Sequence, residues 1–310
     1  MNFIDAVSPR FCTSNRDLDD LLSEYGPYQG RYISNYPKSW KKELIEHLKD
    51  VEVVKLAAQK QLLNPYNENG IEPLLIDDTY PWQEGLTWTE NVQELQKNHK
   101  FNEVIGDIYD PAPYDVFEDV IQRIKQNRKR STTLHGRLGE YIHLIKPLLK
   151  KGPAAYLIDP YFQALSPSGE SFISRIFENI SKSNCFNVHI FTREVNALEK
   201  KSNRQKDKQK AFYSFKEYEL LVKESLSKFN IGNKGFYLHL VDDKDKTPEL
   251  HNRFFLTKYG CIDFGKGFDH FDYETAQISV YIVDREHHLN LVDWFINEKS
   301  KFKSEKVISI

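Results

Sequence analysis

The sequence predicts an α/β protein with a mainly helical N-terminal domain, residues 1–150, and a mixed-sheet C-terminal domain, residues 151–310. Three observations predict this class. The chain has 310 residues, 40% of them hydrophobic and 28% charged, which suits two medium-sized globular domains. Helical spacing dominates the first half of the chain. In the second half, short apolar runs alternate with helical segments.

Three helices are expected in the first half. Their apolar spacing covers residues 38–63, 89–97 and 112–127. Ser39 or Pro37 can open the first helix, and Thr89 can cap the second. The loops between them carry proline and tryptophan and match no motif, so the role of this domain stays open.

The second half alternates strands with helices. Strands are expected at residues 155–158, 187–191, 236–241 and 276–283, with two more around His251 and Asp263, and helices at residues 168–180, 207–229 and 288–298. Strand–helix–strand connections imply parallel neighbours joined by right-handed crossovers. The glycine-linked strands around His251 and Asp263 then complete a mixed sheet.

Polar residues follow the expected parallel strands where each one ends. Asp159 follows the first strand, Arg193 the second and Asp242 the third. Ligands of open α/β sheets collect outside the carboxyl ends of the strands. Pro160 favours an extended conformation for Asp159 at its strand exit. We expect Asp159 and Arg193 to contribute to a binding site, and ordinary solvated loop residues are the alternative.

The most informative motif lies between residues 250 and 269. His251 and Arg253 are two positions apart in an apolar run, so they share a face if the run is a strand. A glycine turn then leads to a second run that ends in Gly265-Lys266-Gly267. Arginine, lysine and glycine amides all bind phosphate well. The motif therefore predicts a phosphate site, in which the two glycines can alternatively form a bulge or turn.

These residues resemble a known family. His251-x-Arg253 followed by Gly265 is similar to the phospholipase D signature, HxKxxxxD with a later GSxN. The run into Gly265-Lys266-Gly267-Phe268-Asp269 is similar to the phospholipase D-like C-terminal domain of MIT-domain proteins. The resemblance covers roughly residues 150 to 300. It implies a phospholipase D-like fold and a phosphodiester ligand, with nucleic acid as the expected polymer, within an assembly of the antiviral-defence type.

The sequence departs from the catalytic signature at three positions. Arg253 replaces the lysine, Lys258 the aspartate and Phe268 the asparagine. In active members one histidine attacks phosphorus and a second protonates the leaving oxygen. The resemblance thus favours phosphodiester binding by Arg253, Lys266, Gly265, Gly267, Arg193 and Asp159.

Two alternatives stay open. The first is a metal-independent phosphodiesterase or nuclease, with His251 and Arg253 as catalytic residues and a site completed by dimerisation. The second is an adaptor that binds anionic lipid, as the MIT-associated domains suggest, while its N-terminal domain recruits a protein partner.

Composition limits the remaining classes. A net charge of −2 argues against a nucleic-acid binder that works through overall charge, although basic runs at residues 123–130 and 200–210 can act locally. No cofactor motif or metal-ligand spacing is present. The three cysteines are far apart, and neither an apolar leader nor a membrane span is evident, which together predict a cytoplasmic protein.

Overall fold

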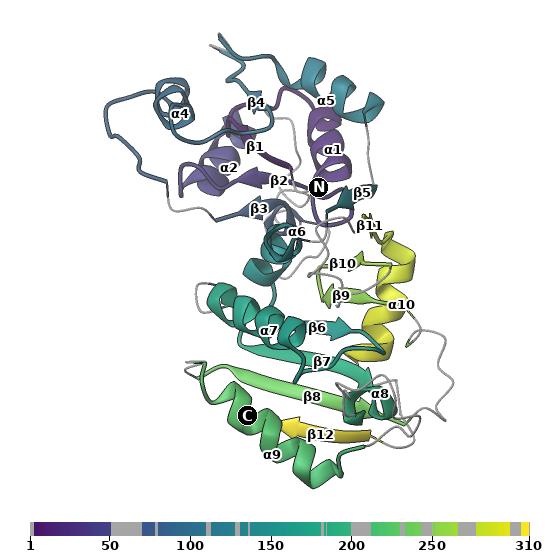
Figure 1. Ribbon diagram of the computed structural model, residues 1–310. Helices are drawn as coiled ribbons and strands as arrows, with labels where there is room; N and C mark the ends of the chain where they lie inside the picture. Colours follow the sequence, from purple (N-terminus) through teal and green to yellow (C-terminus); the bar gives the residue numbers. More distant parts are fainter. Residues whose placement is uncertain are drawn as a thin grey trace. The chain divides into compact units, whose positions relative to one another are not determined.

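The computed structural model consists of two compact units, Met1–Arg130 and Ser131–Ile310, each with its own β-sheet (Figure 1). The structure describes residues 3–50, 70–77, 80–109, 113–127, 131–135, 137–180, 183, 185–199, 212–229, 233–242, 250, 252–265, 277–297 and 305–309. The protein is therefore mixed α/β in both halves.

The N-terminal unit is built on a four-stranded parallel sheet. Its strands are β1 (Phe3–Val7), β2 (Arg31–Ser34), β3 (Leu75–Ile76) and β4 (Val104–Ile105). They lie in the order β3-β2-β1-β4, and every pair is parallel. The prediction of a mainly helical domain missed this sheet, although helices contain most of the regular structure among the described residues of the unit. Strands of two to five residues are too short for a period of two to stand out in the sequence.

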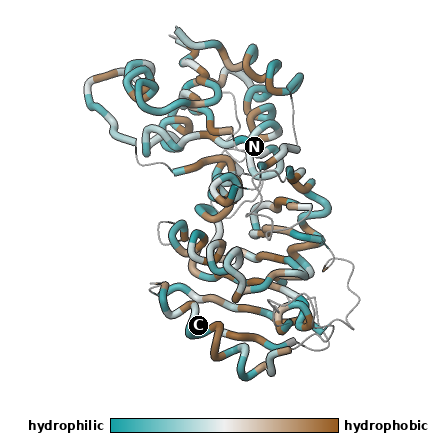
Figure 2. The backbone as a smooth tube through the Cα atoms, viewed as in Figure 1, coloured by the Kyte–Doolittle hydropathy of each residue, from teal (hydrophilic) through white to brown (hydrophobic). Residues whose placement is uncertain are grey.

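Helices connect these strands. They are α1 (Asn15–Glu24), α2 (Trp40–Asp50), α4 (Trp88–Gln96) and α5 (Phe117–Gln126), with a 3₁₀ turn at Glu72–Leu74. Thr87, and not Thr89, caps α4 by accepting a hydrogen bond from the Glu90 amide. Hydrophobic and hydrophilic positions alternate along the helices, as expected for elements with one buried face (Figure 2). Residues 51–63, the remainder of the first predicted helix, lie outside the described residues.

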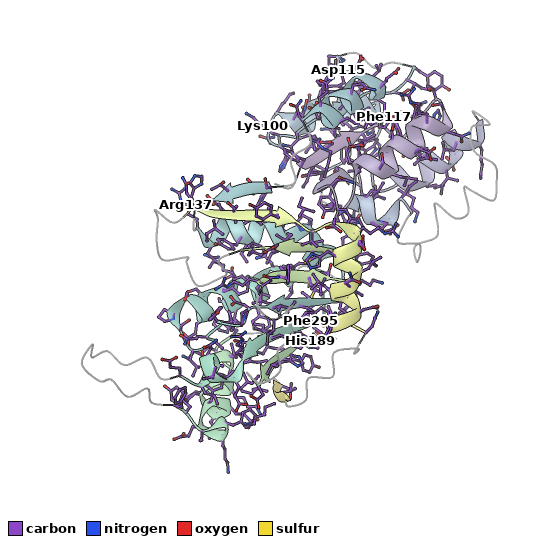
Figure 3. All side chains as sticks on the ribbon, turned by 90° about the vertical axis from the view of Figure 1, so that its right-hand side faces the viewer. Lys100, Asp115, Phe117, Arg137, His189 and Phe295 are labelled. Atoms are coloured by element: carbon purple, nitrogen blue, oxygen red, sulfur yellow. The ribbon has the colours of Figure 1, made fainter. Side chains whose placement is uncertain are left out.

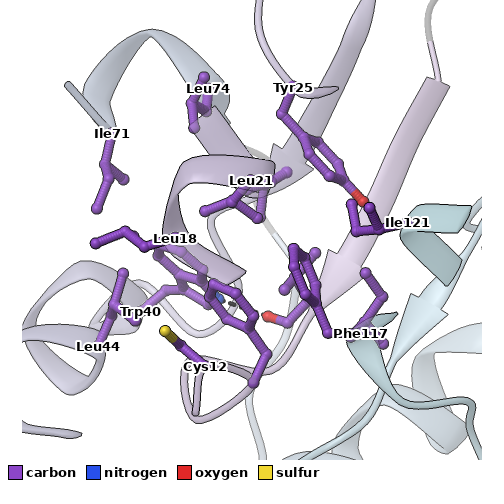
Figure 4. Close-up of a cluster of buried hydrophobic side chains, with 14 of the residues drawn as sticks. Cys12, Leu18, Leu21, Tyr25, Trp40, Leu44, Ile71, Leu74, Phe117 and Ile121 are labelled. Atoms are coloured by element: carbon purple, nitrogen blue, oxygen red, sulfur yellow. Dashed lines mark hydrogen bonds between the residues drawn. The ribbon is translucent and has the colours of Figure 1, made fainter. Parts of the chain in front are cut away.

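A tryptophan lies at the centre of the main core of the N-terminal unit (Figure 4). Trp40 is fully buried, and its Nε1 donates a hydrogen bond to the Val7 carbonyl oxygen at 2.5 Å. Leu18, Leu21 and Phe117 from α1 and α5 belong to the same cluster. The indole therefore connects the end of the central strand β1 to α2.

The same unit contains a buried ion pair on its central strand. Asp5 of β1 is fully buried and pairs with Arg31. Its carboxylate also accepts hydrogen bonds from the Tyr25 hydroxyl at 2.9 Å and from the Glu103 amide at 3.0 Å. Burial outweighs these partners and raises the pKa of Asp5 to about 6.

The C-terminal unit contains an eight-stranded mixed sheet. Its strands are β5 (Ser131–Leu134), β6 (Ala154–Ile158), β7 (Asn187–Arg193), β8 (Gly235–Val241), β9 (Phe254–Thr257), β10 (Gly260–Asp263), β11 (Ile278–Ile282) and β12 (Glu305–Ser309). Their order is β12-β8-β7-β6-β9-β10-β11-β5. The three central strands β6, β7 and β8 are parallel, and the flanking strands pair antiparallel. The mixed sheet was predicted correctly.

Helices cover the two faces of this sheet unequally. They are α6 (Leu138–Lys151), α7 (Pro167–Ile180), α8 (Glu194–Leu198), α9 (Phe215–Leu226) and α10 (Arg285–Phe295). On one face, Phe177 of α7 packs on Phe236 of β8 with ring centroids 5.7 Å apart. On the other, Phe295 of α10 meets Phe191 of β7 at 5.2 Å (Figure 3). All the strands predicted for this half are present, as are parts or all of the predicted helices.

The unit boundary lies earlier than the predicted residue 150. Contacts divide the chain between Arg130 and Ser131. The strand β5 belongs to the second unit because it pairs antiparallel with β11, and α6 belongs there because Tyr141 stacks on Phe264 at 5.3 Å. These contacts join residues far apart in sequence, so local patterns gave no sign that residues 131–150 belong to the second unit, and α6 was not among the predicted helices.

Two remaining predictions concern the chain as a whole. Within the described residues, every helix is too short or too polar to traverse a lipid bilayer. The three cysteines carry free thiols and are buried, and burial raises the pKa of Cys12 and Cys185 to about 11.

Candidate functional site at the sheet edge

The topology brings four chain segments to one edge of the C-terminal sheet. The parallel strands β6 and β7 end there, and β9 begins there because it runs antiparallel to β6, with Ile158 opposite Phe254. Residues that follow β10 return to the same edge, since β10 pairs antiparallel with β9. We call Asp159, Tyr161, Arg193, Arg253 and Gly265 the edge site.

An ion pair lies at the centre of the edge site. Asp159 is fully buried, and its Oδ1 lies 3.4 Å from Nε of Arg253, whose side chain is 18% exposed. The guanidinium also donates from Nη1 to the Gly265 carbonyl oxygen at 2.8 Å and lies over the Tyr161 ring, 4.8 Å from its centroid. Three partners therefore hold Arg253 in one orientation.

A glycine turn supplies one of these partners. Gly265 has a φ of +47°, in the left-handed region that favours glycine, and an added Cβ would lie 3.2 Å from the Ser279 carbonyl oxygen. Its amide donates to Oδ1 of Asp263 at 2.8 Å. The sequence assigned this amide to a phosphate. In the structure it would have to leave Asp263 before reaching an anion.

Arg193 lies on the other side of the β6 exit. It is the last residue of β7, it is half-buried, and its amide donates to the Pro160 carbonyl oxygen at 3.3 Å. The Asn196 side chain donates to the same oxygen at 2.7 Å. Because β7 and β9 are the two neighbours of β6, the backbones of Arg193 and Arg253 flank the loop that begins at Asp159, roughly 10 Å apart by strand spacing. The register gives the two arginines positions on opposite faces of the sheet.

The structure brings together some of the predicted residues. Asp159, Arg253 and Gly265 are in contact, and Arg193 belongs to the neighbouring strand. Asp159 acts by holding Arg253, because its buried carboxylate faces the guanidinium. The strand β9 begins at Phe254, so Arg253 precedes the strand on which it was expected. His251, Lys266 and Gly267 lie outside the described residues.

The groups of the edge site are suited to anion recognition. An arginine fork binds two oxygens of one phosphate in its own plane. Nη2 of Arg253 makes no hydrogen bond within the part of the chain that the structure describes, whereas Nη1 and Nε face Gly265 and Asp159. No cluster of three histidine, cysteine or acidic side chains that could hold a metal ion occurs among the described residues.

Sequence reasoning missed a row of aromatic rings on the same sheet. Tyr156 of β6, His189 of β7 and Tyr237 of β8 stack on one another, and His239 lies beside them. Along these strands buried apolar residues alternate with half-exposed residues, and the rings occupy half-exposed positions. That alternation was visible in the sequence, but only the strand order shows that the rings meet.

The described part of the first basic run is paired with carboxylates, and its residues 128–130 lie outside the described residues. Arg123 pairs with Glu103 and Asp115, and Lys125 pairs with Asp20. These two charges are therefore offset within the N-terminal unit. The run at residues 200–210 lies outside the described residues.

No family model matches this chain, and a search of the curated proteins finds no match. The likeness to phospholipase D-like domains stays a prediction from the motif residues. Function is therefore argued from the chemistry of the site itself.

Proposed function

We propose that the C-terminal unit binds phosphodiesters, with nucleic acid as the ligand class, at the edge site. The observation that carries the proposal is the arrangement of Arg253. Asp159, the Gly265 carbonyl and the Tyr161 ring fix its guanidinium before any ligand arrives. A side chain held in its binding orientation loses little conformational freedom on association, which raises affinity.

The charges of the site support recognition of one or two phosphates. Asp159 offsets the charge of Arg253, so Arg253 contributes mainly the planar geometry of its fork. Arg193, at the end of the neighbouring strand, brings a second guanidinium to the edge. Two arginines on either side of one loop suit different phosphates of one polymer that passes over the end of the sheet.

The described groups of the edge site favour binding over turnover. Hydrolysis of a phosphodiester requires a nucleophile and a proton donor. Asp159 is buried against Arg253, and the guanidiniums are poor proton donors at neutral pH. Binding is therefore the activity that the described residues support.

Fluorescence anisotropy with a labelled oligonucleotide tests this proposal. Arg193→Gln removes a charge, and Arg253→Lys keeps the charge beside Asp159 but removes the fork. Each should weaken binding of a single-stranded oligonucleotide about five- to tenfold at low salt, and Arg193→Gln should also reduce the magnitude of the salt slope by about 0.7.

Arg175→Gln is the matched control. Arg175 lies on α7, where its side chain is 59% exposed and pairs with Glu178. This variant should bind like the parent. Equal affinity of all three variants and the parent would refute the proposal.

A further inference from the structure

One face of the C-terminal sheet carries upright rings across three neighbouring strands. Tyr156 stacks on His189 with centroids 4.7 Å apart and planes 10° apart. His189 stacks in turn on Tyr237 at 4.6 Å and 12°. The register places the three residues directly opposite one another. The distances between ring centroids match the roughly 4.8 Å between strands, so each ring turns its flat face toward the ring on the neighbouring strand.

A second contact fixes the middle of this row. Nδ1 of His189 lies 3.0 Å from Nε2 of His239, two residues beyond Tyr237 on β8. His239 also stacks on Phe191 at 4.2 Å and 8°. Phe191 is buried and contacts Phe295 of α10, whereas His189 and His239 are half-buried. The row therefore reaches solvent beside the part of the face that α10 covers.

Among the described residues the row ends at Tyr237, which has one ring face directed away from its neighbours in the row. His189 covers the side toward β7, and the other side faces β12, where the residue opposite Tyr237 is Ser309. Ser309 is exposed and has no ring. The next ring position, about 4.8 Å beyond Tyr237, therefore lies over the small side chain of Ser309, and another planar ring can stack on Tyr237 there.

A glycine makes room for the terminal ring. A Cβ on Gly235 would lie 2.8 Å from Cε2 of Tyr237 and 2.6 Å from Oδ1 of Asn187. Real side chains do not approach so closely. The ring of Tyr237 thus lies along the backbone of its own strand, in a place that only glycine leaves open.

We propose that this row is a stacking platform for the bases of single-stranded nucleic acid. The inference rests on the proposed phosphodiester binding and narrows its ligand. Every base has a π-face that stacks on tyrosine or histidine, and only an unpaired strand offers its bases freely. Arg193 follows His189 by four residues on the same face of β7, about 13 Å along the strand, a span that a few nucleotides cover. Phosphates at the edge site and bases on the row can therefore belong to one strand.

Two variants test the platform without touching the edge site. Tyr237→Leu removes the terminal ring. Ser309→Trp leaves every native ring in place and fills the vacant stacking position with its own indole, so it does not depend on a destabilised core. Tyr109→Leu is the control, because Tyr109 is 67% exposed and belongs to the N-terminal unit.

The assay compares a labelled oligo-dT with an abasic oligomer of the same length, which keeps the phosphodiester backbone and lacks bases. Tyr237→Leu and Ser309→Trp should each weaken oligo-dT binding about tenfold and leave abasic binding unchanged. The parent should also prefer oligo-dT to the corresponding duplex. Tyr109→Leu should match the parent on both oligomers.

The possible results separate the two proposals. Parental binding of oligo-dT by both row variants, with the abasic oligomer still bound, would overturn the platform and leave the edge site standing. Failure of the parent to bind either oligomer would refute the edge site and the platform together. The platform would also be overturned if the control Tyr109→Leu weakened oligo-dT binding as much as the row variants do, because the effect would then not be specific to the row.

Discussion

Replacing Asp159 by asparagine should destabilise the C-terminal unit through the arginine that it leaves behind. Asparagine has nearly the same volume and keeps an oxygen for the Tyr161 amide, which donates to Oδ1 of Asp159 at 2.9 Å. The change therefore removes the charge and replaces one carboxylate oxygen by an NH₂ group at almost constant volume. Arg253, with a side chain only 18% exposed, would then be a largely buried cation without its counter-ion.

The size of the effect follows from that burial. Removing one partner of a buried ion pair costs about 3–5 kcal/mol, and the residual exposure of Arg253 places the expected loss near the lower end, about 3 kcal/mol. The double variant Asp159→Asn/Arg253→Met removes both charges and should recover most of the loss, because a neutral pair carries no unpaired charge.

Hydrogen exchange followed by mass spectrometry is the appropriate assay, since two units need not unfold together. Amides of β6, β7 and β9 should exchange faster in Asp159→Asn by a factor that corresponds to about 3 kcal/mol. Amides of β1 and β2 provide an internal control. A loss below about 1 kcal/mol, or a double variant as unstable as the single one, would refute the reasoning.

Three further predictions concern stability. Burial raises the pKa of Asp5 from 3.8 to about 6, so between these pH values the folded state binds a proton that the unfolded state has lost. The stability of the parent relative to Asp5→Asn should therefore fall by up to roughly 3 kcal/mol as pH rises from about 4 to 6. A difference in urea unfolding that does not change with pH would contradict this. In α7, an added Cβ on Gly169 would lie 2.1 Å from the Gln163 carbonyl oxygen, so Gly169→Ala should lower the stability by about 1–3 kcal/mol. An added Cβ on Gly139 of α6 would meet nothing within 4 Å, so Gly139→Ala should leave the stability unchanged or increase it. Thermal melting of the two variants and the parent measures both effects. Trp40→Phe removes the hydrogen-bond donor to the buried Val7 carbonyl oxygen and should lower the urea midpoint by an amount equivalent to about 1–3 kcal/mol. An unchanged urea midpoint would contradict this prediction.

The predictable part of the fold consists of elements long enough to show their period. The strands β7 and β8 have seven residues each and alternate buried with half-exposed positions, and α7 has fourteen residues with a buried stripe. The strands β3 and β4 have two residues each, which no periodicity can identify. The strand β5 reads Ser-Thr-Thr-Leu and acquires its role only through pairing with β11, more than a hundred residues later. Such non-local pairing is invisible to local patterns.

The candidate site shows the same division between local and non-local information. Asp159 and Arg253 were both identified from strand ends and motif spacing. Their contact depends on β9 inserting beside β6 although β7 and β8 intervene in sequence. The ring row likewise needs the strand order β6-β7-β8 and the register that aligns Tyr156, His189 and Tyr237. Residue identity can be read from sequence, whereas adjacency requires the topology.

The salt dependence of binding connects the two proposals. The net charge is −2, and Asp159 offsets Arg253, so a strand at the edge site should form only one or two phosphate contacts that release counterions. The slope of log affinity against log salt should then be about −0.7 to −1.4 for a single strand, and an affinity based on these contacts alone would be weak.

Stacking on Tyr237 and its neighbours does not involve counterion release and persists as salt rises. Raising the salt concentration should therefore weaken binding of both oligomers by the same modest factor, and the ratio of their affinities, which reports stacking, should stay constant. A steep slope shared by both oligomers would show instead that cations outside the edge site dominate, and would remove the reason for assigning recognition to this face of the sheet.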